Sequence, residues 1–163
     1  MWVYPDQHFP DAVAYRTIGE EIFAGKLITN NIYMPLYPIW SYITGQGMIQ
    51  LLMDILLSVI SVFLIFTLSM YIFKDRLSAL LSAFVASIYP HFLFYSVSGL
   101  TEVSYTFLLL LCFLSFHRKK FFLAIIISVL AILVRPTLDF LNPVLIILFV
   151  GIVHKSGWRS VVK

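Results

Sequence analysis

Residues 48–73 read MIQLLMDILLSVISVFLIFTLSMYIF, an apolar run whose one charged side chain is Asp54. A helix needs about 20 residues to cross a hydrocarbon core of about 30 Å. The run is therefore long enough to cross a bilayer with some tilt. This stretch predicts a membrane protein, and the sequence on either side of it agrees with that interpretation.

Four further apolar runs follow, so we expect about five transmembrane spans. Pro90 should kink the second span, and Gly99 should loosen its outer end. The third and fourth runs are short, and they reach an adequate length only with the residues at their outer ends. The tight connections after the first and third spans favour antiparallel hairpins. The expected spans lie near residues 48–73, 77–100, 101–116, 121–138 and 141–153.

The overall composition excludes an ordinary soluble domain. The chain has 163 residues, of which 61% are hydrophobic and 12% charged, and its mean hydropathy is +0.95. Soluble domains carry about 25% charged residues, so this chain has too few to cover a water-facing surface. Its net charge of +3 is mild, and we expect the lipid bilayer, not a nucleic acid, as its partner. The single cysteine, Cys112, allows no disulfide within the chain.

The basic residues give an orientation. Eight of the eleven Lys and Arg residues form clusters after the first, third and fifth expected spans. By the positive-inside rule these clusters are cytoplasmic. The N-terminal segment is then extracytoplasmic and the C-terminus cytoplasmic, as in a multi-pass protein of a bacterial inner membrane. The clusters are Lys74 and Arg76, then Arg118, Lys119 and Lys120, then Lys155, Arg159 and Lys163, whereas Arg16, Lys26 and Arg135 lie on the outer side.

The segment before the first span is expected to form interfacial helices. Asp11–Ala24 has the spacing of an amphipathic helix, which Asp11 can cap and Gly25 can stop. The aromatic and proline-rich run at 32–40 is typical of the headgroup level. The predicted fold is therefore all-α, a membrane helix bundle preceded by an outer segment. The boundaries are 1–46 for the extracytoplasmic loop and 47–163 for the transmembrane bundle.

Two acidic residues of the outer side are candidates for chemistry. Asp11 could act as a general base that takes a proton from an acceptor hydroxyl or amine, or it could only cap its helix. Glu102 opens the third span, where it could line a substrate cavity or hold a metal. It could equally lie in the first turn because a negative charge suits the helix dipole there. These alternatives stay open at the level of the sequence.

Arg135 is the one basic residue at the outer end of a span, where a guanidinium suits bidentate binding of a phosphate. It could also pair with Asp139, four residues on. His91 in mid-span is either a ligand or proton relay, or a helix-packing residue. Asp54 and Gln50 share one helix face, and we expect interhelical hydrogen bonds from them, with a catalytic role as the alternative. The chain contains no metal-ligand spacing, Walker loop or nucleophile elbow.

The order of these features resembles that of a known family. The chain is similar, over roughly residues 9 to 145, to the N-terminal half of the GT-C glycosyltransferases, in particular the protein O-mannosyltransferases and aminoarabinose transferases. Each motif is degenerate by itself, and their order and membrane side together carry the resemblance. The motifs are Asp11-Ala-Val-Ala-Tyr15, Pro35-Leu36-Tyr37-Pro38, Tyr89-Pro90, Thr101-Glu102 and Arg135-Pro136-Thr137.

The resemblance implies an enzyme that takes a sugar from a polyprenyl-phosphate donor on the outer side and passes it to an acceptor, which is a protein, a lipid or a glycan. By position, it implies Asp11 as the catalytic base and Arg135 as the residue near the lipid phosphate. Glu102 matches the acid that opens the later span. Tyr15 and Tyr37 would shape the substrate cavity.

A divalent cation is compatible with the implied mechanism, with Glu102 and His91 as its candidate ligands, and no other cofactor is indicated. The chain also departs from the family. Members begin with a membrane helix before the catalytic loop, run to several hundred residues, and often carry Asp-Glu where Asp11 is followed by Ala12. We therefore expect a fragment of a longer enzyme. The main alternative is a non-catalytic membrane protein, such as a transporter subunit or an assembly or structural factor.

Overall fold

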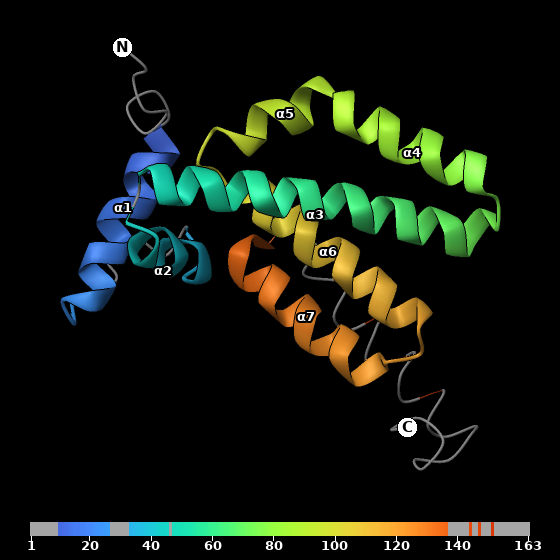
Figure 1. Cartoon of the computed structure of the whole chain (residues 1–163). Helices are drawn as coiled ribbons and strands as arrows, with labels where there is room; N and C mark the ends of the chain where they lie inside the picture. Colours follow the sequence, from blue (N-terminus) through green and yellow to red (C-terminus); the bar gives the residue numbers. More distant parts are fainter. Residues whose placement is uncertain are drawn as a thin grey trace.

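The computed structural model describes residues 10–26, 33–45 and 47–136, together with Val144, Ile147 and Gly151. Within these residues every regular element is a helix (Figure 1). The all-α prediction is therefore confirmed for the described part of the chain. In order, the helices are α1 (Pro10–Phe23), α2 (Leu36–Ile43), α3 (Met48–Phe73), α4 (Arg76–Ile88), α5 (Pro90–Ser96), α6 (Thr101–His117) and α7 (Phe121–Val134).

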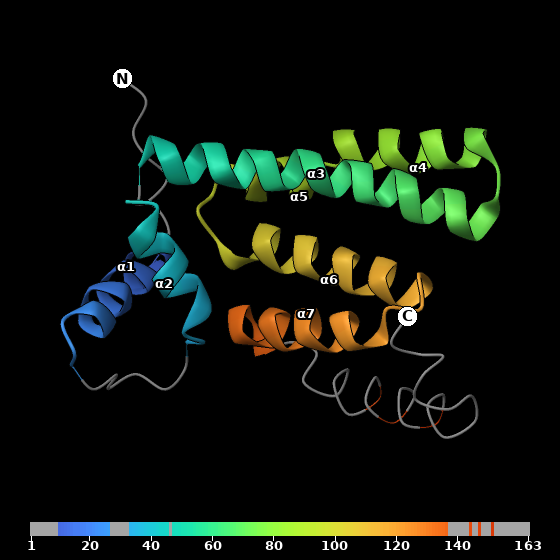
Figure 2. The ribbon, with the colours of Figure 1, turned by 60° about the horizontal axis from the view of Figure 1, so that its bottom comes forward.

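The helices form a bundle with a small cap at one end (Figure 2). α3, α6 and α7 run alongside one another, α4 and α5 fold back along α3, and α1 and α2 lie together at one end. The predicted hairpins α3–α4 and α6–α7 are both present. Lys74 ends α3 in the left-handed region, at φ 55°. Asp75 then caps α4, because its carboxylate accepts a hydrogen bond from the Ser78 amide at 2.7 Å.

The surface of α3 is the reverse of that of a helix in a soluble protein. Its large apolar side chains face outward, with Phe63 67% and Ile49 59% exposed. Soluble proteins bury such residues, whereas membrane helices present them to lipid and keep small polar residues at helix interfaces. This reversal favours a membrane location for α3. The buried residues of α3 are all polar: Gln50, Asp54, Ser58, Ser61 and Ser69.

The structure confirms part of the five-span prediction. Among the described residues, α3 is the one helix that is by itself long and apolar enough to cross a membrane. α4 and α5 meet the same condition together, as a single span bent by 57°. α6 and α7 are apolar but shorter, with 17 and 14 residues. The expected span 141–153 lies outside the described residues, apart from single positions within it.

The predicted kink at Pro90 is confirmed, and it is sharper than a bend in a continuous helix. A proline ring clashes with a helical residue before it and pushes that residue toward extended backbone. Tyr89 accordingly has ψ 119°, and the expected span 77–100 is divided there into α4 and α5. Its outer end is also loosened as predicted, because α5 ends at Ser96 and Gly99 has φ 64°.

The same rule corrects the predicted end of the fourth span. The expected helix continued to residue 138, but α7 ends at Val134. Arg135 precedes Pro136 and has extended backbone, with φ −153° and ψ 125°. The chain therefore turns away from the helix axis at Arg135, and its guanidinium is directed to a neighbouring helix.

The cap is held together by a close approach of α1 to α2. Gly19 of α1 lies against α2 so tightly that a Cβ atom there would stand 2.6 Å from the carbonyl oxygen of Pro38. The ring of Phe23 stacks on Tyr42 at a centroid distance of 4.3 Å. Since α1 carries two of the predicted site residues, this contact fixes their position.

The ends of α1 match the prediction at one end and correct it at the other. Gly25 stops the helix at φ 68°, with its N–H donating to the Ile22 carbonyl and the next N–H reaching back to Glu21, as in a Schellman motif. At the start, Pro10 occupies the first helical position. Asp11 therefore lies inside the first turn and is not the N-terminal cap, so its carboxylate is available to another partner.

The two ends of the bundle differ in chemistry. The ring centroids of Tyr71 on α3 and His117 on α6 are 4.8 Å apart. The Arg118 guanidinium lies 5.8 Å from the centroid of the Tyr71 ring. The C-terminal ends of α3 and α6 thus meet at one end of the bundle, where the two described basic clusters follow them. α1, α2, the start of α6 and the end of α7 lie at the opposite end.

Candidate functional site

A polar cavity of about 180 Å³ lies where the cap meets the bundle. Its wall combines the start of α1, the segment before α2, the start of α6 and the end of α7. Four of the five predicted catalytic and substrate-binding residues contribute to this one cavity. The lining residues are Asp11, Tyr15, Tyr33, Met34, Leu100, Thr101, Glu102, Val134, Arg135 and Pro136.

Glu102 and Arg135 are joined across the cavity wall. The Arg135 Nη1 atom donates to Oε1 of Glu102 at 2.6 Å, and the two side chains remain 26% and 41% exposed for Glu102 and Arg135 respectively. They meet because α6 begins and α7 ends at the same end of an antiparallel hairpin. Only one of the five guanidinium N–H donors is needed for this bond. The alternative partner Asp139 lies outside the described residues.

Asp11 is bonded to a residue that the sequence did not single out. The Tyr33 hydroxyl donates to Oδ1 of Asp11 at 3.0 Å. This hydrogen bond is the main reason that the pKa of Tyr33 is raised above its ordinary value of 10.0, and burial and the charge of Asp11 act in the same direction. Tyr33 therefore stays a neutral donor at physiological pH, and it orients the carboxylate at the edge of the cavity.

Tyr15 stands at the centre of an aromatic cluster beside the carboxylates. Its ring meets Tyr33 edge-on at 5.2 Å and Tyr37 edge-on at 4.9 Å. Burial raises the pKa of the Tyr15 phenol, and the charges of Asp11 and Glu102 raise it further, against a hydrogen bond with Thr101 that lowers it. Tyr15 is consequently a neutral hydrogen-bonding group in the cavity wall.

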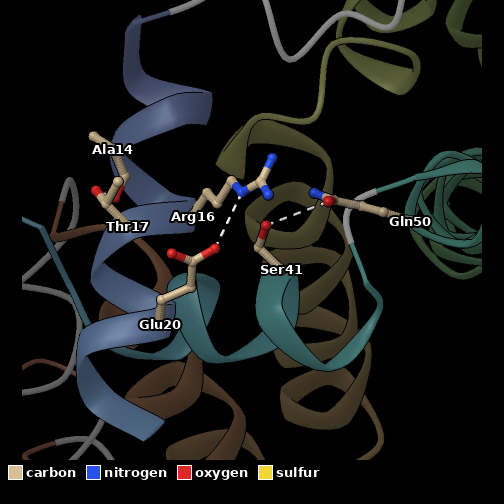
Figure 3. Close-up of polar contacts among 6 residues, drawn as sticks. All are labelled: Ala14, Arg16, Thr17, Glu20, Ser41 and Gln50. Atoms are coloured by element: carbon tan, nitrogen blue, oxygen red, sulfur yellow. Dashed lines mark hydrogen bonds and ion pairs between the residues drawn. The ribbon is translucent and has the colours of Figure 1, made fainter. Parts of the chain in front are cut away.

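Tyr37 lies behind the cavity and connects α2 to α3. It is 1% exposed, and its hydroxyl accepts a hydrogen bond from Nε2 of Gln50 at 3.1 Å. Ser41 donates to Oε1 of the same amide at 3.3 Å (Figure 3). Burial, followed by the charge of Asp54, holds the pKa of Tyr37 well above 10.0. The interhelical bonding predicted for Gln50 is confirmed, whereas Tyr37 supports Tyr15 from behind and does not line the polar cavity.

Figure 3 also shows a charged pair on α1, in which Arg16 donates from Nε to Oε1 of Glu20 at 3.2 Å. Both side chains are more than half exposed. A solvent-exposed i, i+4 pair of this kind contributes little to stability. Arg16 and Glu20 are thus paired with each other, whereas Asp11 and Tyr15 are the residues of α1 that line the polar cavity.

A second, apolar cavity of about 290 Å³ adjoins the first. Val134 lines both cavities. Tyr37 lines the apolar cavity, and its ring contacts Tyr15, which lines the polar one. The apolar cavity opens between α2, α3, α6 and α7. Its lining residues are Leu36, Tyr37, Ile39, Trp40, Ile43, Leu57, Ser104, Phe107, Leu108 and Val134.

His91 is not brought to the other candidates. It lies exposed on α5, with ring contacts to Tyr89 at 5.5 Å and Tyr95 at 6.5 Å, and it lines neither cavity. Across the described ranges, no group of three or more His, Cys, Asp or Glu side chains gathers to hold a metal ion. Glu102 is therefore the one proposed metal ligand that reaches the cavity.

Sequence reasoning missed Tyr33 and Thr101. Tyr33 carried a usable signal, because it is the first aromatic residue of the Tyr and Pro run that precedes the first span. Thr101 stood in the quoted Thr101-Glu102 motif, and it is 4% exposed beneath Tyr15. Each contacts a residue that was predicted: Tyr33 donates a hydrogen bond to Asp11, and Thr101 forms a hydrogen bond with Tyr15.

The cavity therefore offers an accessible carboxylate, neutral phenols and a guanidinium within one small volume beside an apolar space. Such a set can accept a proton, donate hydrogen bonds to hydroxyls and stabilise an oxyanion. Comparison of the chain with protein-family models, curated proteins and solved structures finds no match.

Proposed function

We propose that the chain is part of a membrane glycosyltransferase that moves a sugar from a polyprenyl-phosphate donor to an acceptor on the extracytoplasmic side. One observation carries the proposal. Asp11, Tyr15, Glu102 and Arg135, which were proposed as site residues from the sequence and its resemblance to the family, line a single cavity. They come from three helix ends that are far apart in sequence, and packing of a structural bundle alone does not require their convergence.

In this proposal Asp11 is the general base. It takes the proton from the acceptor hydroxyl or amine, whose oxygen or nitrogen forms a bond to the anomeric carbon. The bond from that carbon to the phosphate oxygen breaks, and the electron pair leaves with the lipid phosphate. Arg135 stabilises the charge that develops on the phosphate. Tyr33 holds the Asp11 carboxylate by its 3.0 Å hydrogen bond.

In this proposal Glu102 orients the guanidinium group of Arg135. Its bond to Nη1 at 2.6 Å fixes one side of the Arg135 guanidinium. The planar fork then presents its remaining N–H groups in a defined direction, which matters for a bidentate phosphate contact. A divalent ion, if the enzyme uses one, would have Glu102 as its ligand from the described residues and would supply further charge stabilisation at the phosphate.

The adjoining apolar cavity supports an amphipathic substrate. A lipid-linked sugar phosphate needs a polar space for the sugar and phosphate and an apolar space for the first isoprene units. The 180 Å³ polar and 290 Å³ apolar cavities meet at Val134, next to Arg135. A soluble sugar nucleotide has no apolar chain that would fill the apolar cavity.

The distribution of basic residues supports a site outside the cytoplasm. The two described basic clusters follow α3 and α6 at the end of the bundle opposite the cavity, and the positive-inside rule assigns that end to the cytoplasm. We therefore propose an integral, multi-pass protein of a bacterial inner membrane, with about five spans, an extracytoplasmic cap and a cytoplasmic C-terminus. The reversed surface of α3 is the observation that favours the membrane.

A non-catalytic membrane protein, such as a transporter subunit, is the second candidate. The break between α4 and α5, bent by 57°, favours it, because transporters use discontinuous helices at their binding sites. The two functions differ in what happens to the donor. A transporter leaves the sugar–phosphate bond intact, and a transferase breaks it.

Replacement of Asp11 by Asn tests the proposed function. The Asn oxygen still accepts the Tyr33 hydrogen bond, so the cap should fold, but the amide cannot take a proton. With membranes that contain the full-length enzyme and polyprenyl-phosphate mannose or aminoarabinose as donor, we expect the parent to consume donor and the Asp11→Asn variant to lose nearly all of this activity. Glu21→Gln, a neutralised acid on the same helix away from the cavity, is the matched control. Equal consumption by Asp11→Asn and Glu21→Gln would remove Asp11 from the mechanism.

A further inference from the structure

Asp54 is a buried acid that has no role in the proposed transferase mechanism. It lies on α3, it is 1% exposed, and neither carboxylate oxygen has a hydrogen-bond partner within the part of the chain that the structure describes. The ion pairs among the described residues join Arg16 to Glu20 and Arg135 to Glu102, and neither involves Asp54. The interhelical bonding predicted for Asp54 is therefore absent among the described residues, although Gln50 on the same face has it.

Other buried polar atoms of α3 and α6 also lack partners among the residues that the structure describes. Ser58 lies one turn along the same face of α3, is 7% exposed, and its hydroxyl is one of them. The buried hydroxyl of Ser104, on the helix α6 that packs against α3, is another within the same described ranges. By contrast, the Ser61 hydroxyl donates to the Leu57 carbonyl at 2.8 Å.

This arrangement is unfavourable unless a positive charge is supplied. An ionised carboxylate at this depth, about 9 Å from the start of the helix at 1.5 Å per residue, has lost its water and has gained no donor. Buried polar groups are otherwise almost always paired. Oxygen ligands, a carboxylate with hydroxyls, are the donors that small hard cations prefer.

We propose that Asp54 binds a small monovalent cation, a proton or Na⁺, inside the bundle, with the Ser58 hydroxyl as a further oxygen ligand when the cation is Na⁺. This inference is independent of the proposed transferase function, because neither Asp54 nor Ser58 lines the polar or the apolar cavity. Tyr37 connects Asp54 to the polar cavity, because the charge of Asp54 raises the pKa of Tyr37 and the ring of Tyr37 packs against Tyr15.

Thermal unfolding of the full chain in lipid nanodiscs tests the proposal. The parent and Asp54→Asn are compared in NaCl and in choline chloride of equal concentration, from mildly acidic to mildly alkaline pH. Asn is neutral and nearly the same shape, so it mimics the occupied site. If Na⁺ is the ligand, NaCl raises the Tm of the parent at alkaline pH by roughly 3–6 °C over choline, and Asp54→Asn loses this response.

If the ligand is a proton, the Tm of the parent falls relative to Asp54→Asn as the pH rises, and NaCl adds nothing. Comparison with the variant removes the contributions of other groups that titrate near this end of α3. The neighbouring helices carry Tyr37 and Tyr42 on α2, His91 and Tyr95 on α5, and Glu102 and Tyr105 at the start of α6, whereas α4 contributes only Arg76 at its far end. Identical pH and salt responses in parent and variant would overturn the proposal.

Serine variants separate the Na⁺ site from a general salt effect. Ser58→Ala should reduce the Na⁺ response, and Ser61→Ala, which removes a hydroxyl already bonded within the helix, should keep it. A full Na⁺ response in Ser58→Ala would remove Ser58 from the site. A second measurement needs no variant: dicyclohexylcarbodiimide modifies protonated carboxyls in apolar surroundings. Mass spectrometry should find Asp54 modified more at lower pH or protected by Na⁺, and modification that depends on neither would contradict the proposal.

Discussion

Arg135, the residue after α7, and Glu102, in the first turn of α6, form an ion pair with 2.6 Å between Nη1 and Oε1. The two residues are 33 positions apart and meet only because α6 and α7 form a hairpin. The extended backbone of Arg135 before Pro136 ends α7 at this level. The pair therefore holds the guanidinium at the mouth of the polar cavity.

Replacement of Arg135 should weaken binding of the lipid-linked donor. A hydrogen bond to a charged group contributes about 1.5–3 kcal/mol, so Arg135→Ala should raise the donor Kd roughly 10- to 100-fold. Arg135→Lys should recover only part of the loss, because an ammonium lacks the planar fork. Binding of polyprenyl-phosphate mannose to the chain in nanodiscs measures the effect. Lys26→Ala, which removes an outer cation away from the cavity, is the control, and unchanged donor affinity in Arg135→Ala would leave the Glu102 pair as a purely structural contact.

The Asp11–Tyr33 hydrogen bond should be visible in an alkaline titration. Since the folded pKa of Tyr33 is raised, the bond is fully present below pH 10.0 and is lost as the pH rises through the folded value. Asp11→Asn removes the negative acceptor, so part of the phenolate absorbance at 295 nm should appear at lower pH than in the parent. The double variant Asp11→Asn with Tyr33→Phe should lack that part. Superimposed titration curves of parent and Asp11→Asn would show that the bond is absent in solution.

The sequence predicts this site to the extent that helix periodicity and membrane side determine it. Asp11 and Tyr15 are four residues apart, so any helix over this segment presents them on one face. Glu102 and Arg135 each mark the outer end of a span, and a hairpin connection puts those ends together. These relations need no knowledge of rotamers or packing, but they give only two separate pairs of residues. That α1 packs beside the α6–α7 hairpin, so that all four residues line one cavity, is a result of the fold.

Partners across helices are a different matter. Whether Arg135 would bond Asp139 or Glu102 depends on the backbone at one X-Pro step, which turns the side chain toward α6. That Tyr33 would reach Asp11 depends on the path of the chain between α1 and α2. The buried state of Asp54 depends on how α2 and α6 cover α3. Such relations follow from rotation and depth of packing, which a hydrophobic pattern does not specify.

Gly19→Ala should loosen the cap and with it the site. A methyl group there would stand 2.6 Å from the Pro38 carbonyl oxygen and 3.0 Å from Cβ of Tyr42, so α1 and α2 must move apart. Overpacking of this kind costs about 1–3 kcal/mol. We expect faster proteolysis of the α1–α2 segment and lower donor affinity than in Gly47→Ala, where the nearest atom is at 3.7 Å. Equal protease resistance in the two variants would mean that the close contact does not hold the cap.

Cysteine labelling tests the sidedness on which the proposed function rests. Cys112 is 1% exposed, so the native chain should react little with a membrane-impermeant maleimide, and single new cysteines report their own location. Lys26→Cys, beyond the end of α1, should be labelled in intact cells. Lys120→Cys, between α6 and α7, should be labelled only after the membrane is opened, because its cluster follows the positive-inside rule. If the pattern is reversed, with Lys120→Cys labelled in intact cells and Lys26→Cys only after opening, the cavity faces the cytoplasm, where a donor on the outer leaflet cannot reach Arg135. If both cysteines react under the same condition, the two ends of the bundle lie on one side, and a transmembrane arrangement is excluded.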